Sequence, residues 1–242
     1  MRYAILSDIH ANLEGLTQVL HTLRNDSIDG YYCLGDIVGY GANPNECIDE
    51  IRNVAGVSLA GNHDWAAAGV MPLDYFNDFA REAIIWTRGV LTAGNSSFLG
   101  KLQLVLNDPA MTMVHGTLID PEDFHYMFNS GIARETFQVM KTDVCFVGHT
   151  HVAGVFIRDE TGGVSFDARP AVSIEKGRKY IVNAGSVGQP RDNNPEAAYC
   201  VFDTGAMTVE IKRVVYDIAS ARRKMLNAGL PRFLAERIIV GR

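Results

Sequence analysis

Five short blocks of this sequence end an apolar run on Asp, Asn or His, residue types that bind metal ions through oxygen and nitrogen. The blocks are Asp8-Ile9-His10, Gly35-Asp36, Gly61-Asn62-His63-Asp64, His115-Gly116 and Gly148-His149-Thr150-His151. Divalent cations held by such groups can activate water for hydrolysis. Buried charged or imidazole groups need a partner, so a shared metal site explains their recurrence better than chance does.

Each block follows a run that is predicted to be a β-strand: 3–6, 31–34, 57–60, 111–114 and 144–147. Ligands of an α/β sheet collect at the carboxyl ends of its strands, so these five ends predict one site. Side chains alternate along a strand, which places Asp8 and His10 on the same side, about 6.6 Å apart.

In this order, the five blocks resemble the calcineurin-like metallophosphoesterase superfamily, in particular its small bacterial and archaeal phosphodiesterase-like branch. They span most of the first two-thirds of the chain. The resemblance implies an α/β protein, a four-layer α/β/β/α sandwich in which two packed mixed β-sheets are flanked by helices. It also implies a two-metal site that hydrolyses phosphate esters.

The resemblance also implies which residues hold the two divalent metal ions. Metal one would take Asp8, His10, Asp36 and His151, and metal two would take Asp36, Asn62, His115 and His149. Asp36 is the expected bridge, because a carboxylate offers one oxygen to each cation and offsets their repulsion. Mn is the expected metal, and Fe, Zn, Co, Ni and Mg remain alternatives because the donor types do not distinguish them. A metal-bridging hydroxide would attack phosphorus.

Four residues are predicted to act on the substrate. His63 follows Asn62 and points the other way if the backbone is extended, so it is the expected general acid, with Asp64 holding its other ring nitrogen. A purely structural His63 is the alternative. Tyr40, in the glycine-rich loop after Asp36, and Arg191, in the turn that begins at Gly185, are expected to contact the substrate, Arg191 through the phosphate.

The predicted function is hydrolysis of small phosphodiesters, nucleotide-derived ones included. A diester carries one charge and needs few cations, and Arg191 is the one candidate cation beyond the metals. A phosphomonoesterase is an alternative. Phosphoprotein phosphatases typically carry Asp-Arg where this chain has Gly39-Tyr40, and Glu where it has Asp64, which argues against a protein substrate. A non-catalytic metal-binding interaction scaffold is disfavoured because the histidines of all the blocks are present.

Composition predicts one globular domain over residues 1–242, with 47% hydrophobic and 21% charged residues. The net charge of −6 and the scattered basic residues argue against binding extended nucleic acid. No apolar stretch approaches the ~18 residues of a membrane span, and cleavage of a leader would remove Asp8. The four cysteines lack C-x-x-C spacing and are expected to be reduced core thiols in a cytoplasmic protein. The oligomeric state is left open.

Periodicity predicts the order of the elements. Helices are expected at 12–26, capped by Asn12, and at 44–53, capped by Asn43, with a further helical stretch at 76–87. A loop at 116–129 is expected over the mouth of the site. From residue 153 to 216, consecutive strands with glycine-rich turns predict a second, largely antiparallel sheet, and two helices at 218–227 and 231–240 complete the chain.

Overall fold

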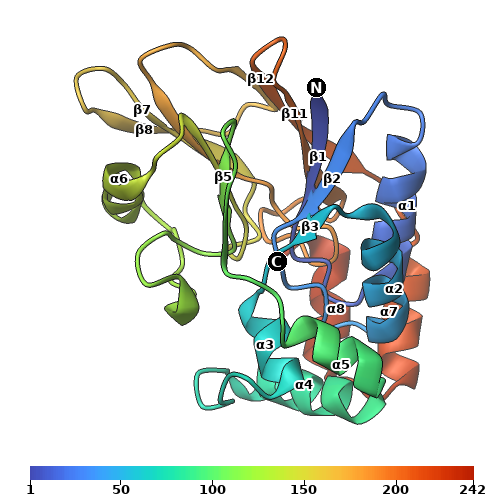
Figure 1. Cartoon of the computed structure of the whole chain (residues 1–242). Helices are drawn as coiled ribbons and strands as arrows, with labels where there is room; N and C mark the ends of the chain where they lie inside the picture. The colour runs from blue at the N-terminus through green and yellow to red at the C-terminus, as the bar shows by residue number, and fades with distance from the viewer.

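Residues 1–242 form two six-stranded β-sheets in a computed structural model (Figure 1). The first sheet has the order β3 (Val57–Ser58), β2 (Gly30–Cys33), β1 (Arg2–Leu6), β11 (Ala197–Asp203), β12 (Thr208–Val214) and β9 (Ala171–Ser173). The second has the order β4 (Val105–Asn107), β5 (Thr112–Val114), β6 (Val144–Val147), β10 (Lys179–Asn183), β7 (Gly154–Arg158) and β8 (Val164–Asp167).

Helices cover the outer faces of both sheets (Figure 1). On the first sheet lie α1 (Leu13–Leu23), α2 (Pro44–Val54) and α7 (Ile218–Asn227), with α8 (Arg232–Val240) packed on α7. On the second sheet lies α6 (Ser130–Val139). The helices α3 (Asn62–Ala68), α4 (Asp78–Val90) and α5 (Ala93–Leu99) gather at the bottom of the view. A short 3₁₀ helix spans Pro121–Asp123.

Alternation along the strands builds three hydrophobic layers between these elements. In β1, Ala4 and Leu6 face the 33-residue cluster beneath the helices of the first sheet, whereas Ile5 faces the 16-residue cluster between the sheets. A third cluster of nine residues joins α6 to the second sheet. Both sheets are mixed, because β1 runs parallel to β2 and β10 runs parallel to β6. The predicted four-layer sandwich is confirmed.

The prediction that the strands after residue 153 form a sheet of their own is wrong. β9, β11 and β12 complete the first sheet, and β7, β8 and β10 complete the second. Residues 197–202 of β11 and 180–183 of β10 are buried, so both strands need neighbours on both sides. They find them by pairing with β1 and β6 from the first half of the chain.

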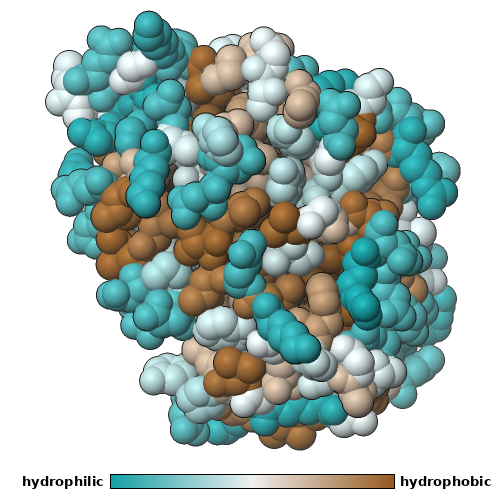
Figure 2. Space-filling model, in the orientation of Figure 1, coloured by the Kyte–Doolittle hydropathy of each residue, from teal (hydrophilic) through white to brown (hydrophobic).

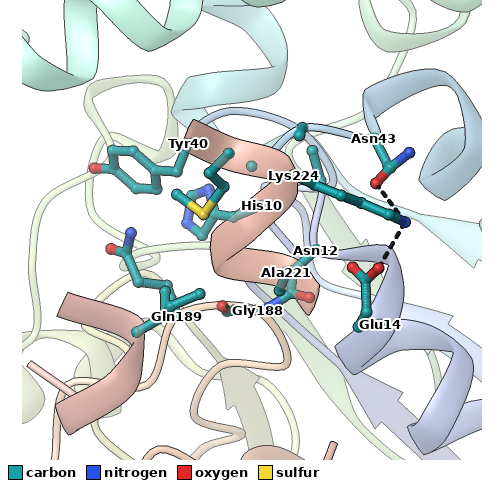
Figure 3. Close-up of a pocket in the computed structure, with 14 residues that line it drawn as sticks. His10, Asn12, Glu14, Tyr40, Asn43, Gly188, Gln189, Ala221 and Lys224 are labelled. Carbon is teal, nitrogen blue, oxygen red and sulfur yellow. Dashed lines mark hydrogen bonds and ion pairs between the residues drawn. The ribbon is translucent and has the colours of Figure 1, made fainter. Parts of the chain in front are cut away.

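Asn12 caps α1 as predicted, since its Oδ1 accepts the Gly15 N–H at 3.0 Å. Asn43 precedes α2 but makes no side-chain cap. Its Oδ1 instead accepts a hydrogen bond from Lys224 of α7 at 3.2 Å, and Lys224 also forms a 2.6 Å ion pair with Glu14 (Figure 3). The helix α7 is thereby tied to the first turn of α1 and to the loop that follows β2. None of the helices has the length and apolar character needed to cross a membrane.

Candidate metal centre

The five sequence blocks meet at the carboxyl ends of β1, β2, β5 and β6 and at the start of α3, but their backbone is not extended. β1 ends at Leu6, and Asp8 and His10 lie in the following loop, so strand alternation does not place them as predicted. Six predicted site residues have positive φ, between 50° and 65°: Asp8, His10, Asp36, Tyr40, His149 and His151. Such conformations cost on the order of 1–3 kcal/mol each and cluster at functional sites.

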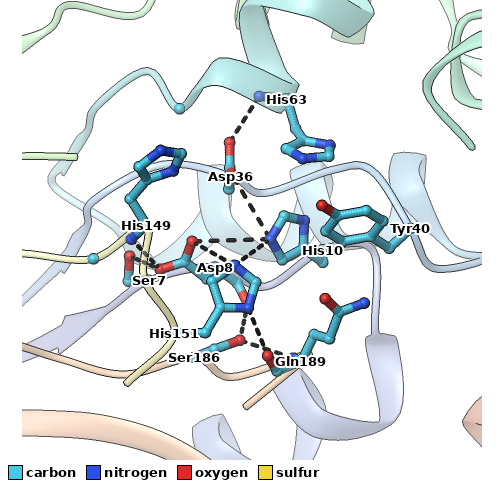
Figure 4. A network of polar contacts seen from close by, with 12 residues as sticks. Ser7, Asp8, His10, Asp36, Tyr40, His63, His149, His151, Ser186 and Gln189 are labelled. Atoms are coloured by element: carbon cyan, nitrogen blue, oxygen red, sulfur yellow. Dashed lines mark hydrogen bonds and ion pairs between the residues drawn. The ribbon is translucent and has the colours of Figure 1, made fainter. Parts of the chain in front are cut away.

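The candidate metal-ligating side chains form two groups that share Asp36. The first ligand group consists of Asp8, His10, Asp36 and His151 (Figure 4). The second ligand group consists of Asp36, His115 and His149. Within each group, one donor atom from every residue lies within 4.8 Å of the others, and all six residues are at most 4% exposed.

Backbone carbonyls orient three of the imidazoles. His10 Nδ1 donates to the Val38 carbonyl at 3.1 Å, His151 Nδ1 to the Gln189 carbonyl at 2.5 Å, and His115 Nδ1 to the Leu34 carbonyl at 3.0 Å. A carbonyl only accepts, so each Nδ1 carries a proton and each Nε2 is directed at the centre. This is the arrangement in which outer hydrogen bonds set the tautomer of a metal-binding histidine.

The protein alone does not satisfy the atoms that converge here. His10 Nε2 and His151 Nε2 are 3.0 Å apart, and with both rings neutral these two nitrogens present lone pairs to each other. Asp8 Oδ1, Asn62 Oδ1 and His115 Nε2 are buried without a hydrogen-bond partner. Buried polar atoms without partners are costly, and a cation among them removes that cost. The residues therefore fit a divalent metal site.

Three of the histidines are neutral near pH 7. Burial lowers the pKa of His10 and of His149 well below the usual range of an imidazole. Burial also lowers the pKa of His151, and the Arg191 guanidinium acts in the same direction. Neutral imidazoles can offer a lone pair to a metal ion.

The carboxyl groups of the centre remain ionised. Burial acts to raise the pKa of Asp8 and of Asp36, but His151 holds the pKa of Asp8 below its usual range, and His115 does the same for Asp36. Burial acts to lower the pKa of His115, but the two carboxylates outweigh it and raise that pKa to about 9. Without a metal ion, two carboxylates thus face one imidazolium, and the excess negative charge favours a cation.

Glycines next to the ligands allow the loops to approach the carboxylates. A Cβ on Gly61 would lie 2.0 Å from Asp36 Oδ1, and a Cβ on Gly148 would lie 1.9 Å from Ser7 Oγ. Ser7 is a buried residue that the sequence reasoning missed, and its hydroxyl donates to Asp8 Oδ2 at 2.6 Å. Its position between an apolar strand and a ligand was the available signal.

Asn62, His63 and Asp64 form the first turn of α3, so the extended backbone expected there is wrong. The predicted hydrogen bond between His63 and Asp64 is also wrong. Asp64 accepts the N–H groups of Val38 and Gly61, at 3.1 and 3.2 Å, while His63 Nδ1 has no partner. Through these two hydrogen bonds, Asp64 holds the loops around the centre in place. Burial and the nearby Asp36 raise the pKa of Asp64 to about 8.

The His63 ring lies beside the centre without belonging to either ligand group. Its centroid is 4.9 Å from the His10 ring, 4.4 Å from the Tyr40 ring and 5.1 Å from the Phe76 ring. Burial lowers the pKa of His63 to about 4. The ring is neutral in the free protein, and a nearby negative charge is needed to protonate it.

Tyr40 and Arg191, the predicted substrate contacts, lie together at the edge of the first ligand group. The Tyr40 ring is 4.5 Å from the His10 ring. The Arg191 guanidinium donates to Tyr40 Oη at 3.3 Å and to Gln189 Oε1 at 2.8 Å. Arg191 also donates its backbone N–H to the His151 carbonyl at 3.1 Å, so its charge is held close to the ligands.

A cleft of about 650 Å³ opens over the second ligand group. Asn62, His63 and His149 contribute to its lining. One wall comes from residues 70–77, between α3 and α4, and the other from residues 122–126 of the loop predicted to cover the site. In Figure 1 both segments lie on the left of the view, and in Figure 2 the surface is indented between them.

Comparisons with known proteins agree with this geometry. A model of the calcineurin-like phosphoesterase superfamily domain matches residues 1–207. The chain is 40% identical over 243 residues to the uncharacterized protein MJ0912 of Methanocaldococcus jannaschii, covering 99% of this chain and 98% of that protein. It superposes with a TM-score of 0.89 on the crystal structure of a metallophosphoesterase from Sphaerobacter thermophilus, at 40% identity over 100% of this chain and 99% of that one.

The chain therefore belongs to the calcineurin-like phosphoesterase superfamily and is a metal-dependent hydrolase of phosphoester bonds. The fold extends to more distant proteins. The hypothetical protein PH1004 of Pyrococcus horikoshii OT3 superposes with a TM-score of 0.81 at 19% identity, covering 100% of this chain and 98% of that one. The helices α7 and α8 lie beyond the matched residues 1–207, but the alignments with MJ0912 and the Sphaerobacter protein include them.

Proposed function

We propose that the chain is a dinuclear hydrolase of small phosphodiesters that works with two divalent ions, Mn²⁺ in the first instance. The observation that carries the proposal is the position of Asp36, which belongs to both ligand groups. A carboxylate shared in this way suits a pair of neighbouring ions. Asn62 would complete the second group, since its buried Oδ1 lacks a partner and its residue lines the same cleft as His149.

When bound, the ions supply Lewis acidity at the phosphoryl oxygens and a hydroxide nucleophile from water. The protein residues hold and orient the reactants. Hydrolysis breaks the bond between phosphorus and the leaving oxygen, and the oxygen of water replaces the leaving oxygen on phosphorus. His63 lies on the cleft side and donates a proton to that leaving oxygen. Because its pKa is low in the free protein, the acid role depends on the negative charge of the substrate.

The preference for diesters is supported by the small number of cations near the centre. Arg191 is held beside Tyr40, whereas the residues that line the cleft include no lysine or arginine. A dianionic monoester, or a phosphorylated protein segment, would gain from further arginines in these positions. A singly charged diester needs fewer of them.

The test is kcat/KM for bis-p-nitrophenyl phosphate against p-nitrophenyl phosphate, with the Mn²⁺-loaded protein at fixed pH. We expect the diester to be favoured. A clear preference for the monoester would contradict the diester proposal and leave the metal centre intact. Absence of turnover on both substrates, in protein that holds its metal, would instead favour the scaffold alternative.

A further inference from the structure

The cleft over the second ligand group has an unusual lining for a site that handles phosphate. Six of its lining residues are aromatic: Tyr40, Trp65, Tyr75, Phe76, Phe124 and Tyr126. Three of them pack against histidines of the site. Tyr126 stacks on His149 with centroids 3.8 Å apart, and Phe76 and Tyr40 both pack against His63. The aromatic walls are therefore continuous with the place where the leaving group departs.

One exposed ring of the lining is also available to a ligand. Tyr75 is 78% exposed and lines the cleft. Tyr126, on the opposite wall, is 39% exposed but already stacks on His149 and on Phe128. The planar side chain of Tyr75 therefore presents the face on which an aromatic group can stack.

The carboxylates in the lining of the cleft are not accompanied by lysine or arginine. Glu122 and Asp123 line the cleft and are exposed. Arg191 is not part of the lining and is paired with Tyr40 and Gln189, but it is close enough to act on the pKa of His63 and of Tyr126. The carboxylates are thus the charges of the lining itself, and the cation lies behind its inner end. Carboxylates repel an anion and attract a cation.

We propose that this cleft is a leaving-group subsite that selects an aromatic group bearing no charge or a positive charge, and that it rejects an anionic one. The inference rests on the proposed function, because His63 places the leaving oxygen at the inner end of the cleft. The substrate class is then a phosphate ester of an alcohol that carries an aromatic or heteroaromatic ring, such as a phenol or a nucleoside, without further phosphates on the leaving side. Tyr75 stacks on the ring, and Glu122 and Asp123 set the charge preference.

Three methyl aryl phosphates test the charge preference with the Mn²⁺-loaded full chain. Their leaving groups are 4-(trimethylammonio)phenol, 4-nitrophenol and 4-hydroxybenzoate. Each kcat/KM is divided by the rate of alkaline hydrolysis without enzyme, which removes differences in intrinsic reactivity. We expect the cationic substrate to exceed the anionic one by about tenfold at low salt, and the ratio to shrink in 0.5 M NaCl because exposed charges are screened.

Variants assign the preference to residues. The double variant Glu122→Gln, Asp123→Asn is expected to reduce the cation-to-anion ratio to about threefold or less, because both side chains keep their shape and lose their charge. The matched control, Glu135→Gln with Asp143→Asn, changes two exposed acids outside the cleft and leaves the ratio as it is. Tyr75→Ala is expected to raise KM for all three esters about five- to tenfold, while Tyr75→Phe keeps the wild-type value.

A ligand without phosphate probes the cleft independently of catalysis. Benzyltrimethylammonium should bind the Mn²⁺-loaded protein, compete with the aryl esters, and lose affinity in Tyr75→Ala and in the double acid variant. If the enzyme prefers monoesters, the same ratio is measured with the aryl monoesters. The charge preference of the cleft is therefore tested even if the diester proposal fails. A wild-type ratio near one, a preference for the anionic ester, or a ratio that the double variant leaves unchanged would overturn the inference.

Discussion

The two ligand groups of the centre differ in how firmly the protein holds them. In the first, His10 and His151 each donate Nδ1–H to a carbonyl, and Ser7 donates to Asp8. In the second, a carbonyl orients His115, but His149 is held by stacking on Tyr126, a half-exposed residue of the 116–129 loop.

This difference separates a fixed half of the centre from a half that faces the substrate. His149 and Asn62 line the cleft, whereas Asp8, Asp36 and His151 do not. Hydrogen bonds to carbonyls direct a ring more strictly than a stack on a partly exposed side chain does. We therefore expect the first ligand group to bind its ion more tightly and the second group to tolerate more change.

The largest effect is expected from the residue that both groups share. Asp36→Asn removes the charge that both ions need while preserving the side-chain volume. Both ions should be lost together after dialysis, and activity should fall to background. Metal analysis and turnover measure this, with the exposed Asp78→Asn as the matched control. Two ions retained per chain in Asp36→Asn would show that the groups do not depend on a common bridge.

His63 belongs to neither group, so its loss should separate chemistry from metal binding. His63→Gln is expected to keep the metal and to slow turnover by roughly 10²–10⁴, because protonation of the leaving oxygen is lost. The loss should be smaller for p-nitrophenyl esters than for alkyl esters, whose leaving groups need the proton more. His21→Gln, in the last turn of α1 and exposed, is the control. An equal loss on both kinds of ester would argue for a binding role.

During metal removal, the second ligand group should lose its ion before the first group does. Bound metal stabilises the folded state, by about 2.7 kcal/mol for a ligand at a hundred times its Kd. In a chain of this size, full chelation should lower Tm by about 5–10 °C. We expect a chelator titration to abolish activity first, as the second ligand group empties, and to lower Tm later. A simultaneous loss of activity and Tm would contradict the difference between the halves.

The smallest effect is expected at the aromatic support of the second group. Tyr126→Ala removes the ring that stacks on His149 and should weaken the second ion by about two- to tenfold, without changing the first. Tyr126→Phe should behave as wild type. Phe128→Ala is the matched control, since Phe128 stacks on Tyr126 and is exposed. Metal titration by calorimetry distinguishes the two sites, and equal weakening of both would contradict the assignment.

The sequence alone determined much of this molecule, because its signals were local. The ligand residues and their order could be read from apolar runs that end on Asp, Asn or His. The Asn12 cap and the helix that follows it were predicted from spacing and capping chemistry. The donor types, oxygen and nitrogen without thiolate, predicted a divalent metal before any geometry was known.

Only the tertiary structure decided how the ligands are presented. Asp8 and His10 take left-handed conformations because Asp8 N–H and His10 N–H donate to the loop after β2, a pairing that no local pattern encodes. The hydrogen-bond partner predicted for Asp64 was wrong for the same reason. The carboxylate oxygens of Asp64 accept from backbone N–H groups that only folding brings together.

The division of the later strands between the sheets, and a cleft built from residues 70–77 and 122–126, likewise depend on contacts far apart in the chain. The sequence pattern shows that β10 and β11 are buried on both faces. It does not show which strands lie beside them, because the whole fold decides that. Residue types thus predict which chemistry is available, and packing decides which atoms meet.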